Sequence, residues 1–300
     1  MINYIVMLSL VSLSVFPCGV HKDQNPNHKQ FVENDILYSS ENRNHRGWSQ
    51  YLAKSMHHTH KLALTFDDGP HPETTPQLLD ILKKYNVKAT FFAVASRIET
   101  YPDIAKRIVA EGHILASHDY QHINSNSRTE SEYEKSLEKS ILVVRDFYPQ
   151  RHAYYRFPYG AYGRTKEYHQ FNVMRNVGKK LFNENCINFV FWDIDTADWV
   201  SNMLPKDISQ TLHSHLFGGK AFDFEKVVTD GKVSYVKKEF TVEDPLGGGV
   251  VLMHDIHQRT IDGVKIFLES AKDKDIEFTT LDQIDEYRYY SKICELTSFN

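Results

Sequence analysis

Short apolar runs alternate with amphipathic stretches from residue 61 onwards. The apolar runs have the length of strands, and the stretches between them repeat apolar residues with the period of a helix. This alternation predicts an α/β protein with a parallel sheet and helical crossovers. Seven such units favour an irregular (β/α)7 barrel over an open sheet. The predicted strands are Leu62–Phe66, Lys88–Val94, His113–Ala116, Ala153–Phe157, Asn188–Asp193, Val250–Met253 and Glu277–Thr280.

Local signals mark several of the predicted helices. The first begins near Thr75-Pro76, because proline suits the first turn, and it continues through Leu82. Gly112 stops the next helix, and the long stretch after the third strand repeats its apolar residues on one helical face. The predicted later helices are Pro102–Glu111, Glu130–Tyr148, Thr260–Lys272 and Leu281–Tyr290.

One long segment interrupts the alternation between the fifth and sixth predicted strands. In it, alternating apolar residues flank Thr229-Asp230-Gly231-Lys232, and Asp-Gly between such runs is a hairpin signal. We therefore expect residues 217–243 to form a β-hairpin insertion. Gly247-Gly248-Gly249 precedes a strand, whereas a phosphate-binding loop joins a strand to a helix, so we do not interpret it as one.

The N-terminal residues differ in composition from the rest of the chain. Residues 1–20 carry no charged side chain, and the apolar run Ile2–Phe16 is shorter than a transmembrane helix requires. The run is typical of a signal-peptide core, although no Lys or Arg precedes it. We therefore expect residues 1–19 to direct export to the periplasm, the cell envelope or the exterior. Lipidation of Cys18 is an alternative, which the bulky residues before it disfavour.

Residues 20–60 are polar and lack a clear period, which predicts an N-terminal extension before a catalytic domain at 61–291. We interpret its histidines, His57, His58 and His60, as solvated, since no further ligand lies at a fitting spacing. After removal of the signal peptide, Cys186 and Cys294 would remain, either joined as a disulfide or reduced. The sequence leaves both possibilities open.

Composition narrows the range of partners. The 300-residue chain has a net charge of −4 and no basic block, so nothing indicates nucleic acid or an anionic membrane surface as a partner. A hydrophobic fraction of 41% is enough for a substantial core. We expect a monomer, with no membrane signal beyond the N-terminal segment.

Polar side chains gather at the carboxyl ends of the predicted strands. In (β/α) barrels this is the face on which active sites form. These residues are Asp67 and Asp68 after the first strand, His118 and His122 after the third, Arg156 at the fourth, Asp195 and Asp198 after the fifth, and His254 at the sixth.

Two of these groups suggest metal chemistry. Asp67 and Asp68 precede a Gly-Pro turn, and two close carboxylates repel unless a metal or a basic partner neutralises one of them. Taken alone, the pair would be an exposed acidic turn. His118 and His122 are four residues apart and would otherwise be surface residues. Together with a carboxylate they make a set of three ligands with an open position, as in catalytic zinc sites.

The motifs together resemble those of the polysaccharide deacetylase family (carbohydrate esterase family 4). They occur in the family's order and the similarity covers about residues 61–285. The resemblance implies an irregular (β/α) barrel and metal-dependent hydrolysis of an N-acetyl group on a sugar polymer. The motifs are Thr65-Phe66-Asp67-Asp68-Gly69-Pro70, His118-x-x-x-His122, Arg156-Phe157-Pro158-Tyr159, Asp195-x-x-Asp198-Trp199 and Leu252-Met253-His254.

The resemblance also implies a role for each site residue. Asp68, His118 and His122 would hold zinc or another divalent transition metal. Asp67 would be the general base, oriented by Arg156. His254 would be the general acid, oriented by Asp195. The Tyr159 amide would stabilise the oxyanion, and the acetyl pocket would be formed by Trp199, Leu252 and Pro158.

The chain departs from the family pattern at three places. Asp119 stands where Ser or Thr is usual, and this puts the metal preference in question. Phe157 stands where Pro is common, with little expected consequence. The spans after Arg156 and after Trp199 are longer than usual, so we expect substrate shape to differ there.

The sequence therefore predicts a metal-dependent hydrolase that removes N-acetyl groups from an N-acetylglucosamine-containing polysaccharide, with peptidoglycan the first choice. Chitin, chitooligosaccharides and biofilm poly-N-acetylglucosamine are alternatives, as is an O-acetyl esterase acting on xylan. A non-catalytic wall-binding protein would lack some of the catalytic residues, and this chain retains them all. A structural metal site is disfavoured because such sites are normally closed by four protein ligands.

Overall fold

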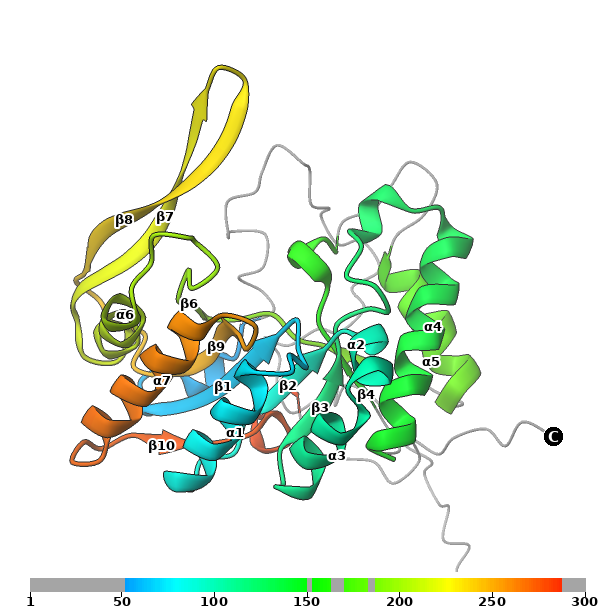
Figure 1. Cartoon of the computed structure of the whole chain (residues 1–300), viewed down its shortest axis with the longest axis horizontal. Coiled ribbons are helices and arrows are strands. Elements are labelled where there is room, and N and C mark those ends of the chain that lie inside the picture. The colour runs from blue at the N-terminus through cyan, green and yellow to red at the C-terminus, as the bar shows by residue number, and fades with distance from the viewer. Residues whose placement is uncertain (1–51, 150–152, 163–169, 183–186, 288–300) are drawn as a thin grey trace, which may run out of the picture.

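The computed structural model describes residues 52–149, 153–162, 170–182 and 187–287 (Figure 1). Its main sheet has parallel strands in the order β5-β4-β3-β2-β1-β9-β6, and β10 pairs with β1 beside this path. The strands are β1 Lys61–Asp67, β2 Thr90–Ala93, β3 Ile114–Ser117, β4 Ala153–Tyr155, β5 Ile187–Phe189, β6 Ile194–Asp195, β9 Gly249–His254 and β10 Glu277–Phe278. All seven predicted strands are confirmed in place, with boundaries that differ by up to a few residues.

The sheet curls into an irregular barrel because β5 and β6, its two edge strands, are joined directly by residues 190–193. At one end of this segment the Val190 amide donates to the Tyr155 carbonyl of β4 at 2.9 Å. At the other end the Asp193 amide donates to the Val250 carbonyl of β9 at 2.9 Å. The segment therefore bridges the gap between the sheet edges, and the predicted barrel is confirmed.

Strand β1 shows how alternation sorts side chains between two faces of the sheet. Leu62, Leu64 and Phe66 are buried in the core cluster that includes apolar residues of α1, α3 and α7. Ala63 belongs to a different core cluster. Because successive strand residues point to opposite faces, Asp67 shares the face of Ala63 and is directed away from those helices. The strand pattern itself thus directs the last carboxylate into the barrel.

Helices follow the strands and cover the sheet (Figure 1). Their bounds are α1 Thr74–Lys84, α2 Ala95–Thr100, α3 Pro102–Ala110, α4 Glu130–Phe147, α5 Gln170–Phe182, α6 Pro205–Phe217 and α7 Gln258–Ala271. Helix α4 begins with a complete capping box between Thr129 and Glu132. The predicted closing helix at 281–290 is wrong for the described residues, because only a 3-10 turn at Leu281–Gln283 forms there.

The predicted hairpin insertion is confirmed and extends beyond the barrel (Figure 1). Strands β7 (Gly219–Thr229) and β8 (Lys232–Val242) pair antiparallel along their whole length. Asp230 and Gly231 form the turn with φ of 50° and 73°, the positive values that a two-residue hairpin loop of this type requires. The Asp-Gly dipeptide therefore specifies the turn directly.

Part of the predicted N-terminal extension packs against the barrel. Ala53 and Met56 are buried, and Met56 ends the 3-10 turn Lys54–Met56 that precedes the first strand. The His57 imidazole lies 2.9 Å from the Asp193 carboxylate, so the expectation that His57 is a solvated linker residue is wrong. The expected signal peptide, Cys18, Cys186 and Cys294 lie outside the described residues. Of the helices described, none is both long and apolar enough to cross a membrane.

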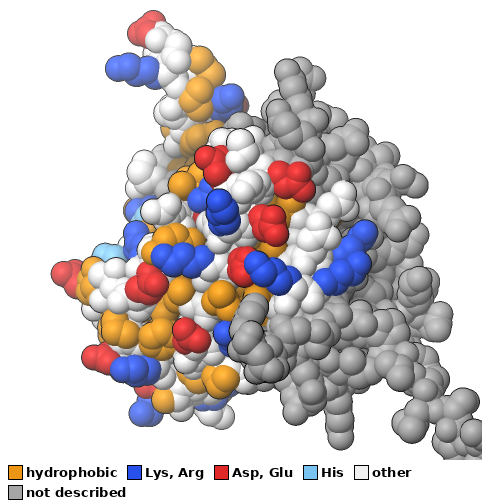
Figure 2. All heavy atoms as spheres, turned by 90° about the vertical axis from the view of Figure 1, so that its right-hand side faces the viewer, with side chains coloured by type: hydrophobic (Ala, Val, Ile, Leu, Met, Phe, Trp, Pro, Cys, Tyr) orange, Lys and Arg blue, Asp and Glu red, His pale blue; other side chains and the backbone are white. Residues whose placement is uncertain are grey.

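Charged side chains of both signs are intermixed on the face shown in Figure 2. That view looks from the side of α4 and α5. The distribution agrees with the small net charge of the chain and with the absence of a basic block in its sequence.

Candidate active site

The carboxyl ends of β1 and β9 bring Asp67 and His254 side by side. The two strands are paired in parallel, and the register places Asp67 directly opposite His254. Both residues are the last of their strands, so their side chains meet where the chain leaves the sheet. Residues 187 positions apart in sequence thus share one site, as expected for this face of a barrel.

Arg156 fills the barrel interior beneath this site. It is fully buried, and its Nη1 donates to Asp67 Oδ1 at 2.8 Å and to Thr65 Oγ1 at 2.7 Å. Its other nitrogens donate to the carbonyls of Val190 and Phe191 at 3.0 and 3.1 Å. Burial raises the pKa of Asp67, and the Arg156 charge counteracts part of that rise. The predicted Asp67–Arg156 pair is therefore present in the structure.

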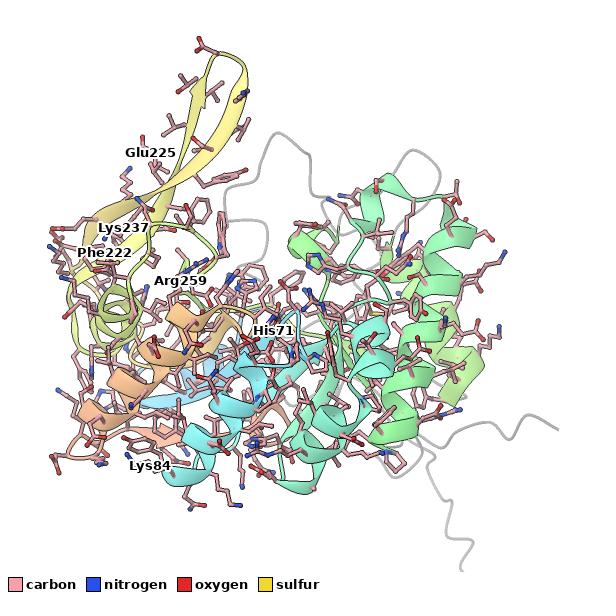
Figure 3. The ribbon with its side chains drawn as sticks, viewed as in Figure 1. His71, Lys84, Phe222, Glu225, Lys237 and Arg259 are labelled. Atoms are coloured by element: carbon pink, nitrogen blue, oxygen red, sulfur yellow. The ribbon has the colours of Figure 1, made fainter. Side chains whose placement is uncertain are left out.

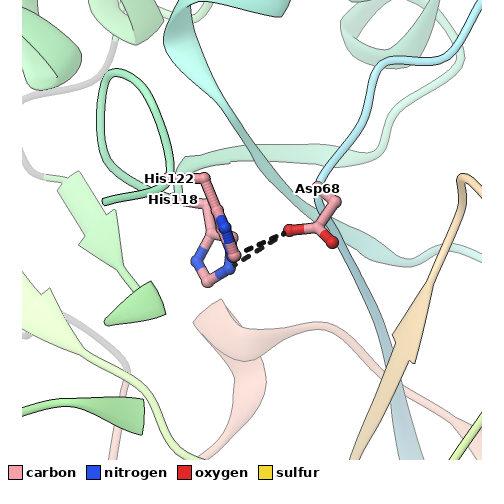
Figure 4. A group of neighbouring side chains, drawn as sticks. All are labelled: Asp68, His118 and His122. Carbon is pink, nitrogen blue, oxygen red and sulfur yellow. Dashed lines mark ion pairs between the residues drawn. The ribbon is translucent and has the colours of Figure 1, made fainter. Parts of the chain in front are cut away.

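Asp68, His118 and His122 meet beside that pair (Figure 4). Asp68 Oδ1 lies 3.5 Å from His118 Nε2 and 3.1 Å from His122 Nε2. His118 Nδ1 lies 2.8 Å from the Arg156 carbonyl, which leaves Nε2 directed at the carboxylate. Burial lowers the pKa of His118 to about 3, so its ring is neutral, as a metal ligand must be.

The three ligand atoms suit a divalent metal. They lie within 4.8 Å of one another, and Asp68 Oδ1 is buried without a hydrogen-bond partner among the described residues. A buried carboxylate oxygen that accepts no hydrogen bond is costly unless a cation satisfies it. A carboxylate with two neutral imidazoles is the donor set of catalytic zinc sites, and a second contact that orients each ring is usual there.

Asp119 braces the loop that carries both histidines. Its Oδ2 accepts hydrogen bonds from the amides of Gln121 and Ile123 at 3.2 and 3.3 Å. Its Oδ1 accepts from Arg128 Nη1 at 2.9 Å and from Ser136 Oγ at 2.7 Å. Asp119 is fully buried. Where Ser or Thr is usual, this chain therefore has a buried carboxylate that braces the loop and pairs with Arg128.

The carboxylate that orients His254 is Asp198, and the expected role of Asp195 is wrong on this point. His254 Nδ1 lies 2.8 Å from Asp198 Oδ1, and the His254 amide donates to Asp198 Oδ2 at 2.7 Å. Asp195 Oδ1 instead accepts the Ala197 amide at 2.8 Å within the intervening turn. Burial alone would lower the pKa of His254, but its pairing with Asp198 raises it to about 10.

The remaining predicted residues lie around this centre. Tyr159 has a positive φ of 60°, its ring packs 4.6 Å from that of His122, and no described residue accepts a hydrogen bond from its amide. Pro158 and Leu252 are buried. Trp199 is half-buried and directly follows Asp198. Arg259 fixes this turn by donating to the carbonyls of Asp198 and Trp199.

Sequence reasoning missed Asp255, which supports the turn after β1. Its Oδ2 accepts from Thr75 Oγ1 at 2.5 Å, and its amide donates to the Asp67 carbonyl at 3.3 Å. A Cβ on Gly69 would lie 2.2 Å from the same carboxylate, so only glycine leaves room for it. Burial raises the pKa of Asp255 to about 7. In the sequence, the one feature that could have pointed to Asp255 is that it is an ionisable residue directly after His254.

Comparison with known proteins agrees with this geometry. The sequence profile of the family described as Polysaccharide deacetylase matches residues 54–179. A peptidoglycan-N-acetylglucosamine deacetylase of Bacillus cereus is 37% identical over 139 residues, which are 46% of this chain and 46% of that protein. The peptidoglycan-N-acetylglucosamine deacetylase PgdA of Listeria monocytogenes is 30% identical over 227 residues, 75% of this chain and 38% of that protein. The chain thus spans less than half the length of either relative.

Solved structures extend the likeness to three dimensions. A crystal structure of a peptidoglycan N-acetylglucosamine deacetylase aligns with a TM-score of 0.56 at 28% identity. The alignment covers 76% of this chain and 89% of that one. The region of likeness therefore includes the barrel and not only the segment matched by the family profile.

Proposed function

Because the chain belongs to the polysaccharide deacetylase family, we propose that it removes N-acetyl groups from a polymer that contains N-acetylglucosamine, most readily peptidoglycan. The observation that carries this proposal is the division of labour between the two adjacent carboxylates. Asp67 pairs with a buried arginine, whereas Asp68 faces two imidazoles. Two similar groups in different environments are suited to different tasks.

Asp68, His118 and His122 would hold a divalent metal, with zinc the first choice for this donor set. Such a metal, when bound, polarises an acyl oxygen and lowers the pKa of a bound water to about 7. The arrangement of this chain's own residues supports the two proton transfers proposed next.

Asp67 would act as the general base through Oδ2. Its Oδ1 is held by Arg156, while Oδ2 lies 3.6 Å from His118 Nε2 and so faces the metal ligands. A carboxylate held in this way accepts the proton of the attacking water without turning away. The raised pKa makes it a stronger base than an exposed aspartate.

His254 would act as the general acid for the leaving amine. Its Nδ1 is held by Asp198, which leaves Nε2 to deliver a proton. The raised pKa keeps the imidazole protonated at neutral pH. The Tyr159 amide would donate to the developing oxyanion, and Trp199, Leu252 and Pro158 would enclose the acetyl methyl group.

Acetate release tests this proposal. We expect purified peptidoglycan to lose acetate and gain free amines in the presence of zinc, and a chelator to stop the reaction. Chitooligosaccharide and acetylated xylan serve as comparison substrates. Release from xylan alone, without free amines from either glucosamine substrate, would contradict the proposal and favour an esterase. The family relatives act at the cell wall by name, so we place the reaction in the cell envelope.

A further inference from the structure

We infer that the β7–β8 hairpin binds the sugar polymer on an aromatic platform formed by Trp199, Phe224 and Tyr235. This inference rests on the proposed function, which identifies the chain that carries the reacting acetyl group. Two of the three rings belong to the insertion, which explains why a deacetylase barrel would carry so long a hairpin.

The three rings form one contiguous cluster. Trp199 lies 4.7 Å from Phe224 and 5.2 Å from Tyr235, measured between ring centroids, and both contacts are edge to face. Phe224 and Tyr235 are themselves 5.7 Å apart. All three residues are only half-buried, so each ring keeps part of its surface open to solvent.

The strand register places Phe224 and Tyr235 on one face of the hairpin. Tyr235 is paired with Lys226, and Phe224 is two residues from Lys226 on the same strand. Both rings therefore project from the same side, which is the side that meets Trp199. Further out on that face, Val228 and Val233 are paired and exposed at 61% and 51%. The apolar residues thus run diagonally along this face of the hairpin, with Lys226 and Lys237 beside them.

The base of the hairpin is fixed to the barrel, so the platform is held in place. Phe222 is buried, and its amide donates to Thr211 Oγ1 of α6 at 2.9 Å. Lys237 Nζ forms an ion pair with Asp207 at 2.6 Å, and its amide donates to Asn202 Oδ1 at 3.0 Å. Figure 3 shows Phe222 and Lys237 near this base and Glu225 further along the projecting part.

The platform is continuous with the catalytic residues. Trp199 follows Asp198, whose carboxylate holds His254, and Arg259 fixes the carbonyls of both residues. The occupant of a surface that starts beside the catalytic imidazole is the substrate chain itself. Aromatic rings offer large rigid apolar faces, and a pyranose ring has a complementary face of C–H groups. The platform therefore suits sugars farther along the chain from the one that reacts, and a polymer supplies these where a trisaccharide is too short.

The test compares Phe224→Ala/Tyr235→Ala with the wild-type protein on insoluble peptidoglycan and on tri-N-acetylchitotriose. We expect co-sedimentation with peptidoglycan to weaken about tenfold or more, because aromatic side chains that a partner covers often dominate the binding energy. We also expect kcat/KM on peptidoglycan to fall about tenfold more than kcat/KM on the trisaccharide. The matched control is Glu225→Ala/Val236→Ala, a directly paired set on the opposite face, which should bind peptidoglycan as the wild type does.

Several results would contradict the proposal that the platform binds the polymer. Equal losses on both substrates would mean that the rings only support Trp199, and unchanged polymer binding would show that they do not contact sugar. A change in molecular mass in solution without a change in polymer binding would assign this face to a second copy of the chain. Co-sedimentation needs no turnover, so loss of binding in the double variant would support the platform even if the wild type released no acetate.

Discussion

Substitution of Arg156 by methionine tests whether the buried charge pair organises the site. The change removes the guanidinium contacts to Asp67, Thr65 and two backbone carbonyls and leaves the Asp67 carboxylate buried without its cation. Breaking a buried ion pair by removing one partner typically costs about 3–5 kcal/mol. We therefore expect Arg156→Met to lower the free energy of unfolding by about that amount.

A double-mutant cycle separates the charge from the lost packing. In Arg156→Met/Asp67→Asn neither charge remains, so the loss should be smaller than the sum of the two single losses by about 1–3 kcal/mol. The assay is urea unfolding of the metal-free protein followed by circular dichroism, with equal m-values as the condition for comparison. A loss below about 1 kcal/mol for Arg156→Met, or additive losses in the cycle, would refute the reasoning.

Three further substitutions probe the other parts of the site. Asp198→Asn removes the attraction that raises the pKa of His254, so the alkaline limb of the pH profile of kcat/KM should move to lower pH. An alkaline limb that does not move would argue against His254 as the general acid. In His118→Ala one ligand is lost, so equilibrium dialysis should find little zinc bound, and full occupancy would exclude His118 as a ligand. In Asp119→Asn the brace loses its charge but keeps its shape, so zinc affinity should fall about 10- to 100-fold. Unchanged affinity in that variant would make Asp119 a residue of fold stability alone.

Much of the barrel could be predicted because local pattern determines it. Five of the seven predicted strands end at or shortly before a polar candidate residue, and the structure brings residues from all five of these strand ends together. The hairpin followed from the Asp230-Gly231 turn, whose backbone conformation few other dipeptides adopt. The candidate metal-ligand set followed from two imidazoles at a four-residue spacing and a carboxylate at a strand end.

The errors concern contacts between segments distant in sequence. Asp195 ends the short strand β6 and Asp198 follows it, and only the turn through Ala197, with its positive φ of 50°, decides which of them reaches His254. The packing of His57 against Asp193 depends on the segment that closes the barrel. No periodicity in the sequence predicts either of these two contacts.

Asp255 shows a related limit. Its carboxylate occupies space that Gly69 leaves open, and Asp255 directly follows β9, which is far from the first strand in sequence. Gly69 was recognised as a turn residue, and its close approach to Asp255 became visible only once the two strands were paired. The requirement for glycine at this position therefore has a steric cause in addition to turn formation.

The most direct test of the central claim is turnover of Asp67→Asn on peptidoglycan, measured with the bound zinc of the same sample. Asn keeps the size of the side chain and removes the base, while Asp68, His118 and His122 remain. The account predicts zinc content equal to the wild type and kcat lower by about 10²–10⁴-fold. Wild-type turnover with zinc bound would contradict the role of Asp67 and the division of labour between the two carboxylates.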